Sequence, residues 1–288
     1  MCDEFIHPGL VTDSRLSRRS FGALALGAAG VAASPALAQS TAIEQDVTVK
    51  TIDGNCDAVL FRPKAEGQHP AVLIWPDIMG LRPAFRDIGR RLSEMGYVVL
   101  VPNPFYRSAK APVIGDNTNF SDPDTRAKLT GYRAAMKNEG IDRDAQAYLA
   151  FLDAQTQTDK NKKAGVQGYC MGGALSFRTA AAVPDRIAAV GSFHGGNGLV
   201  TKDPDSPHLL IAKSNATYLV CQAQNDDATA PTVKDDLKAA FAAAKRPATV
   251  EVYKADHGWC VRGSAVYNEA EAERAWSNLS ALYKAKLA

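Results

Sequence analysis

The chain has 288 residues, of which 46% are hydrophobic and 22% are charged, and its formal net charge at pH 7 is +2. This composition excludes a disordered protein and suffices for one large globular domain or two small ones. Lysine and arginine are scattered among aspartate and glutamate instead of forming basic blocks, so we expect no nucleic-acid partner.

The N-terminal segment has the layout of an export signal. Arg18 and Arg19 precede an apolar stretch at about residues 21–37, and the triplet Ala-Leu-Ala stands directly before Gln39. The run Ser-Arg-Arg-Ser-Phe resembles the twin-arginine type of signal, which exports bacterial proteins that are already folded. A membrane anchor is the alternative, but the stretch is short, rich in alanine and glycine, and weakly apolar for a spanning helix. The segment therefore favours export over anchoring.

Cleavage after Ala38 would divide the chain into a signal and a mature protein. We predict that residues 1–38 are removed and that residues 39–288 form one catalytic domain. The mature protein is expected to be a monomer, periplasmic or secreted, with no stable association with the membrane. No internal repeat and no linker interrupts this part of the sequence.

The cysteines give little support to a metal site. Export would place Cys56, Cys170, Cys221 and Cys260 in a compartment that oxidises thiols. They form no Cys-x-x-Cys pair and their spacing is not that of a zinc site, so we expect no metal. A disulfide among Cys56, Cys221 and Cys260 is compatible with the sequence, although a core of this size does not require one.

Short apolar runs alternate with helical stretches along the mature chain. The predicted strands are a hairpin at 46–63 and runs at 71–76, 97–103, 164–169, 187–195, 217–224 and 248–255. The predicted helices lie at 84–96, 140–155, 173–183, 232–245 and 267–287. Apolar strands separated by helices predict an α/β fold with a mostly parallel sheet covered on both faces. The long irregular segment 104–138 is a candidate lid or pocket wall.

A cysteine occupies the place where many hydrolases carry a nucleophilic serine. The stretch Gln-Gly-Tyr-Cys-Met-Gly-Gly at 167–173 follows a predicted strand and precedes a predicted helix, which is the setting of a nucleophile elbow. Its glycines allow the chain to turn sharply. The amino end of the helix would face the sulfur of Cys170 and favour a thiolate. Cys170 is therefore the predicted nucleophile.

An acid and a histidine follow later strands of the same predicted sheet. Asp226 and Asp227 come after the run at 217–224, and His257 comes after the run at 248–255. Nucleophile, acid and histidine in this order are typical of α/β-hydrolases. Asp226 is preferred over Asp227 because it comes first after the strand. His194, which ends another strand at this edge, is a second candidate for the base.

Backbone amides near the predicted nucleophile can stabilise an oxyanion. The N–H of Met171, directly after Cys170, would supply one donor, and the N–H of Ile78, in the loop after the strand at 71–76, would supply the other. Phe105, Tyr106, Trp259 and Arg262 fit pocket walls as well as ordinary packing or surface positions.

The chain resembles the dienelactone hydrolase family over about residues 45–287. The resemblance rests on the stretch at 167–173, on Trp-Pro-Asp-Ile-Met-Gly and the residues up to Arg107, and on Ala-Asp-His-Gly-Trp-Cys at 255–260. Family members are single-domain α/β-hydrolases that open lactones and other small esters, as carboxymethylenebutenolidases do, without a cofactor. The resemblance implies a triad of Cys170, His257 and Asp226 acting through a thioester acyl-enzyme.

The sequence departs from the family at one position near the site. Where the founding enzymes carry a glutamate that helps to deprotonate the thiol, this chain has Asp77, which is shorter by one methylene. Arg107 and Arg262 are candidates, by neighbourhood only, for the family's substrate-carboxylate arginines. The alternative function is that of a non-hydrolytic thiol or small-molecule-binding protein that retains the fold.

Overall fold

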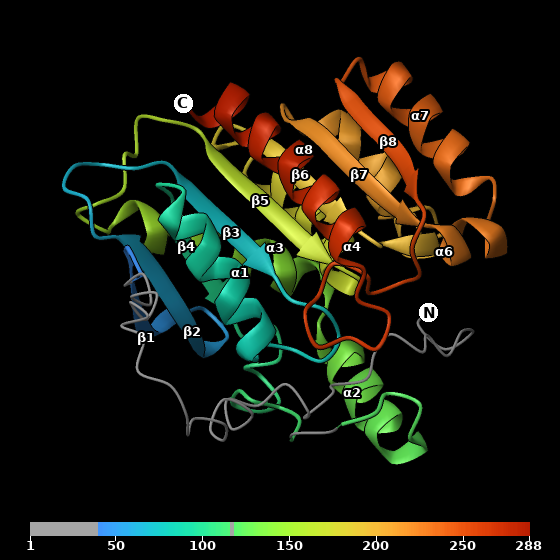
Figure 1. Cartoon of the computed structure of the whole chain (residues 1–288), viewed down its shortest axis with the longest axis horizontal. Coiled ribbons are helices and arrows are strands. Elements are labelled where there is room, and N and C mark those ends of the chain that lie inside the picture. The colour runs from blue at the N-terminus through green and yellow to red at the C-terminus, as the bar shows by residue number, and fades with distance from the viewer. Residues whose placement is uncertain (1–39, 116–117) are drawn as a thin grey trace, which may run out of the picture.

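The strands of the chain form one sheet with the order β1-β2-β4-β3-β5-β6-β7-β8 (Figure 1). The computed structural model describes residues 40–115 and 118–288, so the predicted signal at 1–38 lies outside the described residues. The strands are β1 (Ala42–Thr51), β2 (Gly54–Pro63), β3 (Ala71–Trp75), β4 (Val98–Pro102), β5 (Ala164–Tyr169), β6 (Ile187–Phe193), β7 (Thr217–Ala223) and β8 (Ala248–Tyr253). β2 pairs antiparallel with β1 and β4, and every other pair is parallel.

Helices cover both faces of this sheet. They are α1 (Pro83–Glu94), α2 (Pro123–Ala135), α3 (Asn138–Asp153), α4 (Met171–Ala182), α5 (Pro207–Leu210), α6 (Gln224–Thr229), α7 (Val233–Ala244) and α8 (Glu269–Leu287), with short 3-10 turns η2 (Gly196–Leu199) and η3 (Ile211–Lys213). Phe85 of α1 and Tyr283 of α8 belong to the apolar cluster on the face toward the viewer in Figure 1. Tyr148 of α3, Phe177 of α4 and Phe241 of α7 belong to the second cluster. The predicted α/β-hydrolase fold is confirmed.

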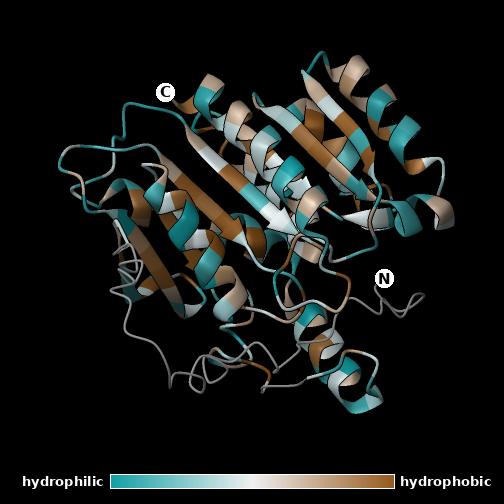
Figure 2. Ribbon diagram, viewed as in Figure 1, coloured by the Kyte–Doolittle hydropathy of each residue, from teal (hydrophilic) through white to brown (hydrophobic). Residues whose placement is uncertain are grey.

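The central strands are buried along their whole length. Every residue of β3, β4 and β5 is buried, and Figure 2 colours much of these strands brown. A strand between two helical layers has no solvent face, so continuous apolar runs replace the alternation of a half-exposed strand. This packing presents the carboxyl ends of the parallel strands along one edge, where ligand sites of open α/β sheets lie.

The segment predicted to be irregular contains a helix, α2. Its start signals are ordinary, since Pro123 is its first residue and the carboxylate of Asp122 accepts the N–H of Thr125 at 2.8 Å. Only Leu129 is buried in it, so the apolar periodicity that reveals a helix in a sequence is weak here. The prediction of an irregular segment is wrong for these residues.

None of the helices in the described part of the chain is long and apolar enough to cross a membrane.

Candidate active site

Cys170 lies in a tight turn between β5 and α4. Its φ is 54° and its ψ is −119°, a conformation that non-glycine residues rarely adopt. The turn requires glycine on both sides, because a Cβ at Gly168 would lie 1.8 Å from the carbonyl O of Gly172, and a Cβ at Gly172 would lie 2.4 Å from the carbonyl O of Trp75. The predicted strand-to-helix turn is thus present, with the cysteine side chain at its tip.

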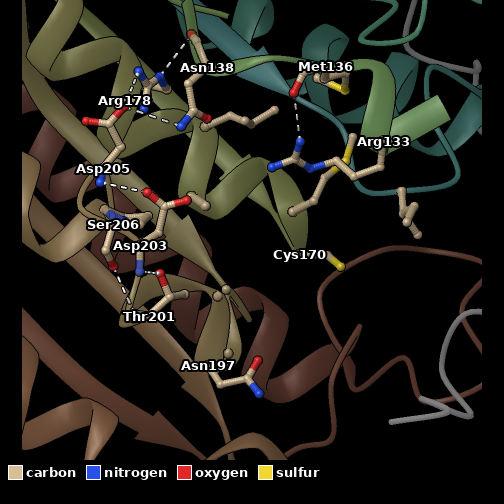
Figure 3. Close-up of a pocket in the computed structure, with 18 of the residues that line it drawn as sticks. Arg133, Met136, Asn138, Cys170, Arg178, Asn197, Thr201, Asp203, Asp205 and Ser206 are labelled. Atoms are coloured by element: carbon tan, nitrogen blue, oxygen red, sulfur yellow. Dashed lines mark hydrogen bonds and ion pairs between the residues drawn. The ribbon is translucent and has the colours of Figure 1, made fainter. Parts of the chain in front are cut away.

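The sulfur of Cys170 faces a cavity of about 570 Å³ (Figure 3). Only 9% of Cys170 is exposed, so the thiol is reached through this cavity. Its lining comes from the strand ends and from the α2 segment, where Phe120, Arg133 and Met136 contribute. The predicted role of 104–138 as a pocket wall is therefore confirmed for these residues. The volume suits a small molecule.

His257 and Asp226 meet beside the thiol. Nδ1 of His257 and Oδ2 of Asp226 are 2.8 Å apart, and each side chain is 5% exposed. Asp227, the alternative acid, pairs instead with Lys234, whose Nζ lies 2.7 Å from its Oδ1. Of the two neighbouring aspartates, the structure therefore places Asp226 against the histidine.

The electrostatic surroundings of His257 favour a protonated imidazole. Burial opposes the cation, but the charge of the Cys170 thiolate, hydrogen bonds to Asp226 and Cys170, and the charge of Asp226 together raise the pKa of His257 to about 10. A histidine with this pKa stays protonated at neutral pH. The imidazole of His257 therefore interacts with both Asp226 and Cys170.

Asn225 is a further residue of the site that the sequence analysis missed. Its Oδ1 accepts the backbone N–H of His257 at 2.9 Å and that of Asp226 at 3.0 Å. One amide oxygen thereby links the segment after β8 to the first turn of α6, the helix that follows β7. Its position directly before Asp226 was the only signal in the sequence, and asparagine is common in such turns.

The two residues predicted to supply oxyanion donors, Met171 and Ile78, both line the cavity. Met171 begins α4, and the first N–H groups of a helix have no partner within it. Ile78 lies in a turn closed by the N–H of Gly80, which donates to the carbonyl O of Asp77 at 2.9 Å. The N–H of Met79 donates to Oδ1 of Asp77, also at 2.9 Å, and tightens the same turn.

Asp77 has a different partner from the one that the family resemblance suggests. Its carboxylate forms a bidentate ion pair with Arg82, with N–O distances of 2.6 and 2.8 Å, and both side chains are buried. Asp77 is not among the residues that line the cavity. Both oxygens are used to hold the turn that carries Ile78, so the structure favours a supporting role over direct activation of the thiol.

The other residues predicted as pocket walls or substrate contacts do not line the cavity; they are Phe105, Tyr106, Arg107, Trp259 and Arg262. Arg107 pairs with Asp144 and Asp53 at 2.7 and 2.6 Å. Trp259 is fully buried and stacks on Tyr253, with ring centroids 5.2 Å apart. Arg262 lies over the ring of Tyr267, 5.8 Å from its centroid. Closeness in the sequence to the predicted site did not predict where these side chains lie, because each packs against or pairs with residues outside the cavity.

The cations that do line the cavity are Arg133, Lys137 and Arg178. Figure 3 shows the guanidinium of Arg133 on the side of Cys170, with a hydrogen bond of 3.2 Å to the carbonyl O of Met136. Arg178 lies farther away and pairs with Asp142 at 2.7 Å. No sequence motif marks these residues. Arg133 lies on α2, Lys137 directly before α3 and Arg178 on α4, and these segments meet at the cavity only in the folded chain.

The remaining cysteines are structural in character. Cys56, Cys221 and Cys260 are free thiols, so the structure contains no disulfide among them. Burial raises the pKa of both Cys56 and Cys221 to about 12, and it raises that of Cys260 as well. Within residues 40–115 and 118–288, no group of three or more histidine, cysteine, aspartate or glutamate side chains is arranged to hold a metal ion.

Comparison with known proteins identifies the family of the chain. The model of the Dienelactone hydrolase family matches residues 56–287. The chain belongs to this family. It is a hydrolase by that membership, and the matched residues include Cys170, Asp226 and His257.

Relatives in several bacteria are similar over most of the chain. A carboxymethylenebutenolidase homologue from Escherichia coli (strain K12) is 27% identical over 235 residues, which cover 80% of this chain and 82% of that protein. The carboxymethylenebutenolidase of Rhodococcus opacus is 27% identical over 187 residues, or 65% of this chain and 68% of that enzyme. A dienelactone hydrolase-type crystal structure from Klebsiella pneumoniae has a TM-score of 0.72 at 24% identity, covering 84% of this chain and 98% of that one.

Proposed function

We propose that this protein hydrolyses small lactones or other small carboxylic esters, with Cys170 as the nucleophile and a thioester as the intermediate. The observation that carries the proposal is the juxtaposition of a strained, cavity-facing cysteine with a buried histidine whose Nδ1 is 2.8 Å from Asp226. The name of the Rhodococcus opacus relative, carboxymethylenebutenolidase, supports the substrate class, because a butenolide is a lactone.

Acylation begins from the thiolate of Cys170 and the imidazolium of His257. The sulfur attacks the ester carbonyl carbon, and the N–H groups of Met171 and Ile78 stabilise the oxyanion of the tetrahedral intermediate. Collapse breaks the carbon–oxygen bond, and His257 gives its proton to the departing oxygen. In a lactone the leaving group stays attached through the ring, so the product of this step is one ring-opened chain bound as a thioester.

Deacylation uses the same groups in the opposite sense. His257, now neutral, takes a proton from water, and the resulting hydroxide attacks the thioester carbonyl. Release of the carboxylic acid returns the sulfur as a thiolate and the histidine as an imidazolium. Asp226 keeps Nδ1 of His257 protonated throughout and stabilises the cation.

The proposal is tested with p-nitrophenyl acetate and the purified mature chain. We expect release of p-nitrophenol and an acetyl adduct on the Cys170 peptide, seen by mass spectrometry. Cys170→Ala should abolish both, while Cys260→Ala, which removes a thiol outside the cavity, should retain them. Turnover by Cys170→Ala at the wild-type rate would refute the nucleophile. A stoichiometric adduct without turnover would instead identify a thiol protein that does not hydrolyse its ligand.

Export of the chain is a separate part of the proposal. Residues 1–38 are proposed to direct it through the twin-arginine route, on the basis of Arg18 and Arg19 before an apolar stretch. Changing both arginines to lysine should leave an unprocessed chain in the cytoplasm, because the pair is recognised by a receptor and not as charge alone. Processed protein still found outside the inner membrane would favour the general secretory route.

A further inference from the structure

Two residues with unusual backbone conformations meet behind the nucleophile. Cys170 has a φ of 54°, and His194, directly after β6, has a φ of 40°. In the described part of the chain, the one other non-glycine residue with positive φ is Lys245, directly after α7. Such conformations are energetically unfavourable and persist only where the surroundings hold them. Contact between two of them at a reactive cysteine points to a functional constraint.

A hydrogen bond joins the two residues. The backbone N–H of Cys170 donates to Nδ1 of His194 at 3.1 Å and also to the carbonyl O of Phe193 at 3.0 Å. His194 is itself held, since its N–H donates to the carbonyl O of Cys221 at 2.8 Å. An amide nitrogen can only donate, so Nδ1 of His194 must accept and carries no proton. The ring is therefore neutral, with its proton on Nε2.

The ring of His194 also lies against the catalytic histidine. His194 is fully buried, and its ring centroid is 4.7 Å from that of His257, with the two planes at 61°. On its other side, Trp259 makes an edge contact with centroids 5.3 Å apart. A second cation at this distance would oppose the imidazolium form of His257. A neutral His194 is compatible with the charge that the proposed mechanism places on its neighbour.

We propose that His194 is a positioning residue for the acylation step. The two acceptors of the Cys170 N–H hold the plane of the peptide bond between Tyr169 and Cys170, from which φ is measured. The helix that begins at Met171 holds the other side of the residue, so the two together set φ and the direction of the side chain. Without the acceptor on His194, the residue can relax toward a common backbone conformation and carry the sulfur away from His257. The inference rests on the proposed function, since it concerns how Cys170 is presented as a nucleophile.

Three substitutions of His194 distinguish the effect of its hydrogen-bond acceptor from the effect of its ring. His194→Asn places Oδ1 where Nδ1 lies and tolerates positive φ. His194→Gly tolerates positive φ but has no acceptor, and His194→Phe retains a ring without an acceptor. We expect His194→Asn to acylate within about fivefold of the wild type, and the other two to lose roughly 10²-fold in acylation rate with little change in KM. The readout is the p-nitrophenol burst from p-nitrophenyl acetate, with the melting temperature of each variant measured alongside.

Other rankings would overturn the proposal. Acylation at the wild-type rate in His194→Gly would show that the acceptor is dispensable, and a fast His194→Phe with a slow His194→Asn would show that the ring acts by packing. Equal losses in all three would also contradict a role of the acceptor.

A measurement on the wild-type chain keeps the test independent of how the variants fold. Nitrogen NMR of the chain labelled with ¹⁵N-histidine should show Nδ1 of His194 without a proton and Nε2 with one at neutral pH. The opposite tautomer, or an imidazolium, would refute the hydrogen bond on which the proposal depends. Absence of a burst in the wild type would count against the proposed function, while the tautomer would still report on His194.

Discussion

The two sides of the cavity are built in different ways. One side, called the floor here, carries the proposed catalytic residues Cys170, Asp226 and His257. They follow β5, β7 and β8, and buried hydrogen bonds such as that between Asp226 and His257 hold them. The cover is α2, in which Leu129 alone is buried. It is attached by contacts such as Lys128 Nζ with the carbonyl O of Val113 at 2.9 Å. Segments with few buried apolar contacts open most easily, so the floor should determine the chemistry and the cover should influence which substrates bind.

The largest effects are expected on the floor. His257→Ala should reduce turnover on the order of 10³-fold or more, and the double variant with Cys170→Ala should be no worse than Cys170→Ala alone, because the two residues act as one unit. Steady-state rates with p-nitrophenyl acetate measure this. Losses that multiply in the double variant would argue against a triad.

The two neighbouring aspartates provide a matched pair. Asp226→Asn should lower turnover on the order of 10²–10⁴-fold, because a neutral amide cannot stabilise the imidazolium of His257. Asp227→Asn should stay within about threefold of the wild type, since it breaks only a partly exposed ion pair with Lys234. The reverse ranking would transfer the role of the acid to Asp227.

The buried ion pair between Asp77 and Arg82 should contribute to the free energy of unfolding. Asp77→Asn leaves Arg82 buried without its carboxylate, and we expect a loss of about 3 kcal/mol in the free energy of unfolding, measured with urea. The double change Asp77→Asn with Arg82→Met should recover much of that loss, because it removes the buried charge. Alkylation of Cys170 by iodoacetamide should stay near the wild-type rate. Clearly faster alkylation would show that the carboxylate acts on the thiolate after all.

Because the pKa of His257 is raised in the folded protein, the free energy of unfolding should depend on pH. The folded pKa of about 10 lies above the usual value of 6.5, so the stabilisation from this group is fully present below about pH 6.5 and is lost as the pH rises toward 10. Urea unfolding of the wild type between these values should therefore show a decline that is smaller in His257→Gln. An identical decline in both proteins would assign it to other groups.

Smaller effects are expected on the cover. Arg133→Gln should raise KM several-fold for esters that carry a carboxylate while leaving kcat and the melting temperature near those of the wild type, since the guanidinium faces the cavity. Uncharged p-nitrophenyl acetate serves as the control substrate. A large fall in kcat for both esters would show that the cover takes part in the chemistry. It would contradict the assignment of chemistry to the floor and of substrate selection to the cover.

Much of the fold was predictable because its signals are local. Continuous apolar runs such as 71–76 predicted buried strands, and helical periodicity predicted helices such as α8. The structure contains both, as β3 and α8. Only α2 was missed among the longer helices, since it buries little apolar surface. The parallel sheet followed from these elements because alternating strands and helices have few other ways to cover their apolar faces.

The sequence by itself determined which residues stand at the carboxyl ends of the strands, including Cys170 and His257, because the order of strands and turns is written along the chain. Only the tertiary structure decided which side chains meet there. It brought Asp226 and not Asp227 to His257, turned Asp77 to Arg82, and placed Arg133 at the cavity. The physical reason is that a side chain's partner depends on its direction and on competing charges from distant segments, and neither is a property of its neighbours in the sequence.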